Sequence, residues 1–428
     1  MKSIPLTTRA IPTLREQADI TNRWLKTRLH TILPEIMKRE GLDMWIISAR
    51  EYNEDPVLMS LLPAPMMSAR RRTILVFHAP ATGEFEALAI ANAGVGLDGY
   101  YQLAWDKRQT SLSEETQEEC LHRVVATRNP TTIGINFSDT FAFGDGLSHR
   151  EHAFLTSALG PQLMKRTVSA EAVAVGWLER RLPEEIAAAQ NANSIAHNLI
   201  AEAFSPAVTQ PGITTALDLS WWLRERTREL GLTCWFQPSV SIQRHNADLG
   251  PIGSSPDEVI MPGDLLHCDF GLHYFGLATD TQQNAYVRRH GETEAPAGLV
   301  AALTTANQQQ DILAQEMIAG RTGNEILRAA LDAMATAGID GRIYTHPIGY
   351  HGHGAGPMIG RYDNQEALPG TGDAVLHDDT LFSFEMYCRS DISEWNGQSV
   401  MLATEQIVAF TEGQVAYLGG RQEKLHLI

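Results

Sequence analysis

The pattern of hydrophobic and polar residues divides the first part of the chain into a helix and several short strands. Apolar positions recur at helical spacing through residues 18–40, and this run stops at a glycine, which predicts an amphipathic helix. Short apolar runs at 43–49, 73–79 and 132–138 are typical of buried strands. Because helices alternate with β-rich runs, we expect an α/β domain over residues 1–172.

From there on, the pattern predicts pairs of helices followed by strands. Pro183 and the two glutamates after it favour a helix start, since proline suits the first helical position and acids complement the helix dipole. That helix is expected over 184–204 and a second over 215–230. A similar arrangement returns after the helix at 310–319, with a Gly-containing loop and a further helix. Two related half-domains, joined by a pseudo-two-fold, are therefore expected within residues 173–428.

Length and composition are those of a globular protein with two domains. The 428 residues include 34 basic and 51 acidic side chains, for a net charge of −17. This balance argues against nucleic acid or an anionic membrane as a partner, because phosphate binding requires clustered Lys and Arg. There is no apolar window of about 18 residues, so we expect no membrane span, and the first 20 residues contain no signal-like h-region. Four scattered cysteines without CxxC spacing favour reduced thiols and a cytoplasmic location.

Two aspartates mark the first candidate site. An apolar strand ends at Asp269, within Asp-Phe-Gly, and Asp280 follows on a second strand-like run. If the chain reverses around Tyr274 and Phe275, the two carboxylates lie directly opposite each other on neighbouring strands. Carboxylates that close repel unless a cation lies between them. Each aspartate alone is typical of a turn, whereas the pair indicates a metal.

A loop rich in histidine and glycine supplies the second candidate. His346, His351 and His353 lie within a stretch that also contains four glycines. Glycine allows the backbone to approach a bound ion, and imidazole is a common nitrogen ligand. A surface loop with incidental histidines is the alternative.

Two glutamates lie inside apolar strands. Glu385 falls within 381–387 and shares a face with Ser383 by strand alternation, and Glu405 falls within 401–408. A buried carboxylate needs a partner; for either glutamate alone this could be a structural salt bridge. Together, four carboxylates and one imidazole balance two divalent ions, among which Mn, Co, Fe and Zn remain open. Two such ions can activate a bridging water and polarise a carbonyl.

The order Asp, Asp, His, Glu, Glu resembles the pita-bread metallopeptidase superfamily, in the branch of aminopeptidase P, prolidase and creatinase. The resemblance covers roughly 175–428, and the preceding α/β domain is similar to that of this branch. It implies a pita-bread fold and the following metal ligands: Asp269, Asp280, His353, Glu385 and Glu405. It further implies that Glu385 is the general base, that the substrate is a short peptide cleaved next to proline, and that the protein is a homodimer.

The sequence departs from the family pattern at the substrate-binding positions. Seven residues after His353, where the family has a second histidine, the chain has Gly360, and only His245 is near the position of the family's upstream histidine. Met386 follows Glu385 where Pro-Gly is common. We hypothesise that His346 and His351 act as catalytic residues in place of these histidines.

Three functions remain open from the sequence. The first is an Xaa-Pro peptidase with two metal ions. The second is a metal-dependent hydrolase or lyase of a small non-peptide molecule on the same scaffold, which the missing histidines favour. The third is a catalytically silent binding protein, which the intact set of ligands disfavours.

Overall fold

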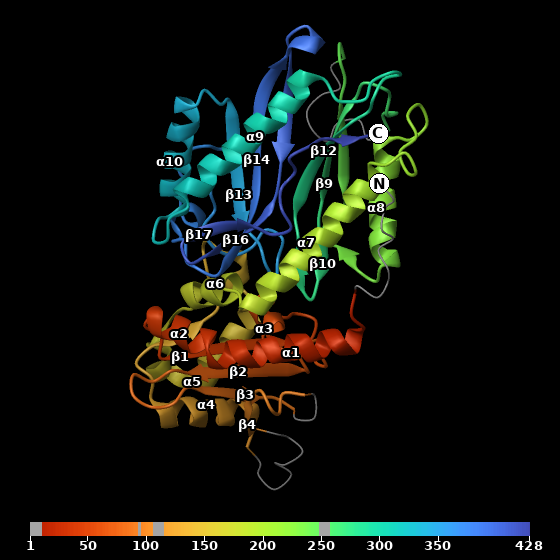
Figure 1. Ribbon diagram of the computed structural model, residues 1–428. Helices are drawn as coiled ribbons and strands as arrows, with labels where there is room; N and C mark the ends of the chain where they lie inside the picture. The colour runs from red at the N-terminus through yellow and green to blue at the C-terminus, as the bar shows by residue number, and fades with distance from the viewer. Residues whose placement is uncertain (1–10, 93–95, 106–114, 248–256) are drawn as a thin grey trace. The chain divides into compact units, whose positions relative to one another are not determined.

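The computed structural model describes residues 11–92, 96–105, 115–247 and 257–428 (Figure 1). The chain forms two compact units, Pro12–Leu182 and Pro183–Ile428, here called the N-terminal and the C-terminal unit. The domain limits expected from the sequence, 1–172 and 173–428, stay a prediction. No helix in the described ranges is both long and apolar enough to cross a membrane. The four cysteines are free thiols.

The N-terminal unit is a six-stranded sheet in the order β4-β3-β2-β1-β5-β6, with helices packed against it. Its strands are β1 (Met44–Arg50), β2 (Arg72–His78), β3 (Glu86–Ile90), β4 (Gln102–Trp105), β5 (Ile133–Ile135) and β6 (Thr167–Ser169). Its helices are α1 (Leu14–His30), α2 (Ile32–Arg39), α3 (Pro56–Ser60), α4 (Gln117–Arg128), α5 (His149–Met164) and α6 (Glu171–Glu179). Apolar residues of β1, β2 and β3 form one core with α4 and α5. The expected α/β architecture is confirmed.

One element of this unit differs from its prediction. The expected helix over residues 18–40 is two helices, α1 and α2, separated at Thr31. Pro34 lies in the first turn of α2, where a residue without an amide hydrogen is tolerated, whereas inside a continuous helix it would remove a hydrogen bond. The chain therefore restarts a helix before Pro34.

The C-terminal unit contains two successive sets of helices and strands. The first consists of α7 (Pro183–Ala203), α8 (Ala216–Glu229), β7 (Thr233–Cys234), β8 (Ser239–Gln243), β9 (Leu265–Phe270), β10 (Leu272–Tyr274), β11 (Leu277–Ala278) and β12 (Thr281–Tyr286). The second consists of α9 (Ala297–Glu316), α10 (Gly323–Thr336), β13 (Gly341–Pro347), β14 (Thr380–Ile392), β15 (Gln398–Thr404), β16 (Ile407–Thr411), β17 (Gln414–Tyr417) and β18 (His426–Leu427). The main sheets run β18-β12-β9-β8 and β13-β14-β16-β17, with β15 also paired to β14. The predicted helices 184–204 and 215–230 match α7 and α8.

The two sets repeat one design, as the sequence pattern predicted. Thr215 caps α8 and Thr322 caps α10, each in a capping box, which satisfies free amide groups of the first turn. Thr215 also forms a single β-bridge with Val259, and Thr322 forms the equivalent bridge with Val375. In each half the chain then continues into a long central strand, β9 or β14, that carries an acidic residue of the candidate site.

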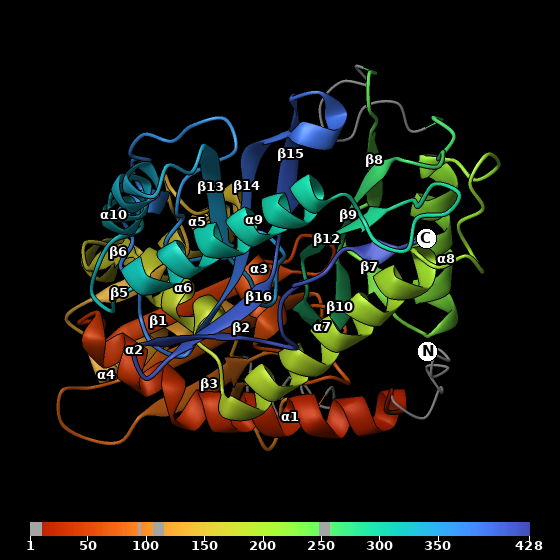
Figure 2. The ribbon, with the colours of Figure 1, turned by 45° about the horizontal axis from the view of Figure 1, so that its top comes forward.

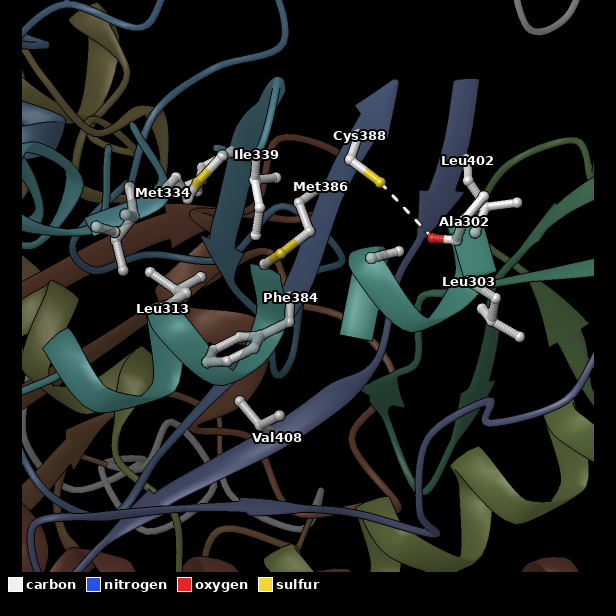
Figure 3. Close-up of a cluster of buried hydrophobic side chains, with 14 of the residues drawn as sticks. Ala302, Leu303, Leu313, Met334, Ile339, Phe384, Met386, Cys388, Leu402 and Val408 are labelled. Atoms are coloured by element: carbon white, nitrogen blue, oxygen red, sulfur yellow. Dashed lines mark hydrogen bonds between the residues drawn. The ribbon is translucent and has the colours of Figure 1, made fainter. Parts of the chain in front are cut away.

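Helix packing decides which face of β14 is apolar. Figures 1 and 2 show α9 lying across β13 and β14, and α7 across the sheet of β9 and β12. The even-numbered residues Phe384, Met386 and Cys388 of β14 belong to the core with α9, where the Cys388 thiol donates to the Ala302 carbonyl (Figure 3). Since side chains alternate along a strand, Glu385 faces away from α9. The core thus fixes the direction of Glu385.

Candidate metal centre

The two aspartates come from one hairpin but do not face each other directly. Asp269 lies opposite Gln282, and the same register continues through β10 and β11. The turn falls at Phe275 and Gly276, with φ of 54° and 75°, because glycine adopts this left-handed conformation readily. The prediction that Asp269 faces Asp280 required a reversal one residue earlier and is wrong. The aspartates are instead diagonal neighbours on one face.

Glu385 and Glu405 face each other across a break between two strands. The residues of β14 after Glu385 pair with β15, and the residues before it pair with β16. Both pairings have the same register, so Glu405 lies opposite Glu385. The expected continuous strand through Glu405 is wrong, since β15 ends at Thr404 and β16 begins at Ile407. In the interval Glu405 bridges to Gln282 of β12. This break therefore connects the two main sheets at the site.

His346 contributes a buried imidazole at the end of β13. Its side chain is fully buried, and Nδ1 lies 3.0 Å from the Pro347 carbonyl. A carbonyl only accepts hydrogen bonds, so Nδ1 carries a proton, and in the neutral ring the lone pair is then on Nε2. Nε2 lies 3.8 Å from Asp280 Oδ2 and 3.6 Å from Glu405 Oε1. A lone pair that faces two carboxylates is the arrangement expected around a cation.

These side chains converge closely enough to share ions. Ligand atoms lie within 4.8 Å of one another in three overlapping groups: Asp269, Asp280 and Glu405; His346, Glu385 and Glu405; and Asp280, His346 and His353. Three of these atoms, Asp269 Oδ1, Asp280 Oδ1 and His346 Nε2, are buried and have no hydrogen-bond partner among the described residues. Buried polar atoms are rarely left unpaired. The set therefore fits divalent cations, which would satisfy all three.

Burial and mutual repulsion disturb the ionisation of the carboxylates. Burial, and then the charge of Glu405, raises the pKa of Asp269, Asp280 and Glu385 well above the ordinary values. Without a cation, these groups therefore retain protons at a pH where exposed carboxylates have lost them. A bound ion would reverse this effect by favouring the charged form.

His353 lies at the rim of the cluster. It is exposed, its Nε2 is 3.3 Å from the Tyr344 hydroxyl, and its ring packs edge-on against His346 at 4.8 Å between centroids. Burial, and then the neighbouring His346, lowers its pKa. His351 follows in the same loop but belongs to none of the metal-binding groups formed by the described residues. The geometry thus favours His346 as the inner imidazole, with His353 seven residues later.

A pocket opens beside Glu385 and Asp269. Its volume is about 220 Å³, and besides those two acids it is lined by His267, Gln282, Arg342, Tyr344, Tyr362, Met386, Tyr387, Met401 and Ala403. Arg342 is exposed, donates to the Tyr362 carbonyl, and makes no salt bridge with a described residue. The pocket therefore combines two acids with aromatic side chains and an exposed guanidinium.

The sequence analysis missed two polar residues of this pocket, His267 and Gln282. Both are almost fully buried. Gln282 donates to Glu385 Oε1 at 3.0 Å, and its own Oε1 lies 2.9 Å from His267 Nε2. A signal was present: His267 is two residues before Asp269 and Gln282 two after Asp280, so strand alternation places each on the face of an aspartate.

Comparison with known proteins identifies the family. The model of metallopeptidase family M24 matches residues 184–412, more than half of the chain. No curated protein matches the sequence.

Solved structures with the same fold include peptidases and one protein of another kind. An X-Pro aminopeptidase from Thermotoga maritima has a TM-score of 0.64 at 17% identity, covering 91% of this chain and 99% of its own. An Xaa-Pro dipeptidase from Bacillus anthracis has a TM-score of 0.63 at 15% identity, covering 94% and 100%. The N-terminal domain of the FACT complex subunit SPT16 from Cicer arietinum has a TM-score of 0.59 at 11% identity, covering 95% and 99%. At such identities the likeness establishes the fold, and the predicted pita-bread architecture is confirmed. By the match to its family model, the chain belongs to metallopeptidase family M24.

Proposed function

We propose that the protein is a peptidase that uses two divalent metal ions to cleave short Xaa-Pro peptides. The observation that carries this proposal is the set of three buried, unpartnered ligand atoms on Asp269, Asp280 and His346. Membership of the M24 family supports it, and so does the Xaa-Pro specificity named for two structures of the same fold. The four negative charges of the carboxylates balance the four positive charges of two divalent ions, whichever of Mn, Co, Zn or Fe is bound.

The ligands in this proposal are Asp269, Asp280, His346, Glu385 and Glu405. His346 replaces His353 of the sequence-based set because its Nε2 is buried among the carboxylates. His353 then occupies the position of the family's second histidine, seven residues on, so Gly360 no longer marks a loss. The expected catalytic role of His351 has no support from the geometry and stays a prediction.

Each residue has a distinct task in this mechanism. The ions, when bound, lower the pKa of a water molecule and polarise the scissile carbonyl. Glu385 Oε1 accepts from Gln282, which leaves Oε2 to take a proton from the attacking water and pass it to the leaving amine. His353 and the Tyr344 hydroxyl, 3.3 Å apart, lie at the rim, where either can donate to the carbonyl oxygen of the substrate.

The pocket limits the size of the substrate. Its volume of about 220 Å³ is below the roughly 300–1,000 Å³ of drug-sized ligand pockets. Dipeptides and tripeptides are therefore favoured over longer chains. The same observation favours the second candidate, a metal-dependent hydrolase of a small non-peptide molecule. In either case Arg342 would bind an acidic group of the substrate.

A substrate panel tests the proposal. Metal-free protein is refilled separately with Mn, Co or Zn and assayed on Xaa-Pro dipeptides, Xaa-Pro-Ala tripeptides and matched Xaa-Ala peptides. We expect cleavage before proline only, lost in Asp280→Asn. Absence of cleavage despite two bound ions per chain would exclude the Xaa-Pro activity and direct the search to non-peptide substrates.

A histidine pair tests the assignment of the imidazole ligand. His346→Gln should lower the metal content, whereas His353→Gln should keep both ions and lower turnover. Metal analysis of the two variants beside the native protein decides this. Metal loss in His353→Gln alone would restore His353 as the ligand.

A further inference from the structure

A short chain of hydrogen bonds leads from a buried histidine to the proposed general base. His267 Nε2 lies 2.9 Å from Gln282 Oε1, and Gln282 Nε2 donates to Glu385 Oε1 at 3.0 Å. His267 and Gln282 are 2% and 3% exposed. They lie on the paired strands β9 and β12 (Figures 1 and 2), whereas Glu385 belongs to the other main sheet. The chain of bonds therefore crosses between sheets.

The chemistry of the three groups sets the direction of this chain. An ionised carboxylate can only accept, so the amide must present its NH2 to Glu385 and its carbonyl to His267. The histidine must then carry a proton on Nε2. Its Nδ1 lies 3.5 Å from the Ser241 hydroxyl, which can donate to it. If the amide turned over, its carbonyl would face a carboxylate, and two buried acceptors would be left without a donor.

The backbone of Gln282 holds the second glutamate. Its N–H donates to the Glu405 carbonyl at 3.1 Å, and the Glu405 N–H returns a bond of 3.5 Å. One residue thus fixes the backbone at Glu405 and one carboxylate oxygen of Glu385. Glu405, in the break between β15 and β16, lies opposite Glu385 of β14, so Gln282 constrains the separation between the two glutamates.

We propose that Gln282 is a positioning residue for Glu385, and that His267 acts through it by fixing the orientation of its amide. The role of Glu385 as general base rests on the proposed function, whereas the hydrogen bonds that hold Glu385 do not depend on it. With Oε1 held, the carboxylate cannot rotate, and Oε2 stays directed toward the attacking water. Partners of this kind contribute about 10–100-fold in metal affinity or activity.

The neighbouring residue provides a matched control. Gln283 is also buried and its Oε1 lies 2.6 Å from His426 Nε2. Its side chain points to the opposite face of β12, because side chains alternate along a strand. Gln283→Met therefore breaks a buried Gln–His hydrogen bond on the same strand without touching Glu385. Its effect measures the purely structural cost of the substitution.

The experiment compares Gln282→Met, His267→Phe, His267→Gln and Gln283→Met, all loaded with Mn. Glutamine suits the rescue because its Nε2 reaches the same place as histidine Nε2. Crystal structures should show the Glu385 carboxylate rotated in Gln282→Met and the Gln282 side chain displaced from Glu385 in His267→Phe, with both native in His267→Gln and Gln283→Met. An unmoved Glu385 in Gln282→Met would overturn the proposal even if the protein proved to lack peptidase activity.

Kinetics give the second readout. We expect kcat to fall about 10–100-fold in Gln282→Met and His267→Phe, with KM within about 3-fold and both ions retained. His267→Gln should recover most of kcat. The proposal fails if Gln283→Met loses as much as Gln282→Met, or if His267→Gln is no better than His267→Phe. A native protein inactive on every peptide would instead refute the proposed function and leave the structural comparison to decide.

Discussion

Glu151 of the N-terminal unit and the acidic cluster of the C-terminal unit are both buried, but their charges are handled in opposite ways. In the N-terminal unit Glu151 is 1% exposed and accepts hydrogen bonds from Ser48 and from Arg72 at 2.7 Å, with Arg50 at 3.1 Å. Burial acts to raise its pKa, but these partners outweigh burial and hold the pKa below its ordinary value. The charge is therefore compensated within the protein.

In the acidic cluster of the C-terminal unit, Asp269, Asp280 and Glu385 form no ion pair with a lysine or arginine of the described residues. Asp269, Asp280 and Glu385 have raised pKa values, and the nearest nitrogen base, His346, presents a lone pair. The difference shows that burial alone does not mark a functional site. What distinguishes the cluster is that several buried carboxylates converge without a counter-charge among the described residues, so the compensating cation must come from solution.

The largest expected effect comes from removing a ligand. Asp280→Asn keeps the size of the side chain but removes a negative charge, so we expect loss of bound metal and a fall in turnover of more than about 100-fold, beyond the cost of losing an indirect partner. Metal analysis and steady-state kinetics measure both. Full metal content in the variant would show that Asp280 is not a ligand.

The corresponding change in the N-terminal unit should act on stability alone. Glu151→Gln leaves Arg72 without its carboxylate, and we expect a loss of about 2 kcal/mol in the free energy of unfolding, since both arginines keep some access to water. Denaturant unfolding measures this. Metal content should not change; if it did, the two regions would not be independent as the comparison requires.

The pH dependence of stability should separate the two regions further. The folded, metal-free protein holds protons on Asp269, Asp280 and Glu385 that the unfolded chain releases near pH 4, because the folded pKa values are raised. Relative to Asp280→Asn, which lacks only the proton on Asp280, its free energy of unfolding should fall as pH rises above about 4, by up to about 1.4 kcal/mol per pH unit.

Thermal unfolding of the native protein and of Asp280→Asn between pH 4 and 8, first with chelator and then with Mn, measures this difference in stability. Mn should reverse it, because the ions displace the protons and stabilise the native protein, whereas Asp280→Asn binds them poorly. A difference that does not vary with pH would show that the cluster is ionised without metal.

The smallest effect is expected at the mouth of the pocket. Arg342→Met removes the guanidinium that lines the pocket while leaving the metal ligands intact, so KM for acidic substrates should rise about 10-fold with little change in kcat. Neutral analogues, such as amidated peptides, should lose nothing. Equal losses on acidic and neutral substrates would exclude recognition of charge by Arg342.

The sequence predicted the acids of the site because their chemistry is local. Asp269 and Glu385 lie in apolar strands, and Asp280 directly precedes a buried one, where an unpaired charge is unexpected. Strand alternation gave the face of Glu385 correctly. The half-repeats were likewise visible as recurring helix and loop signals. These features depend on short-range periodicity, which a single sequence carries.

The remaining features depend on contacts that a single sequence does not carry. The predicted hairpin register was wrong because the turn lies one residue later than the sequence suggested. The strand break at Glu405 is set by its bridge to Gln282, which is far away in the sequence. Likewise, the choice between His346 and His353 rests on which ring is buried among the carboxylates. Neighbouring histidines in a glycine-rich loop give no sign of this.

The most direct test of the account is to locate the metal. Crystals grown with Mn and measured at its absorption edge should show two anomalous peaks, both within bonding distance of Asp269, Asp280, His346, Glu385 or Glu405. No peak at these residues, with the carboxylates hydrogen-bonded to one another instead, would contradict the claim that this cluster is compensated by metal.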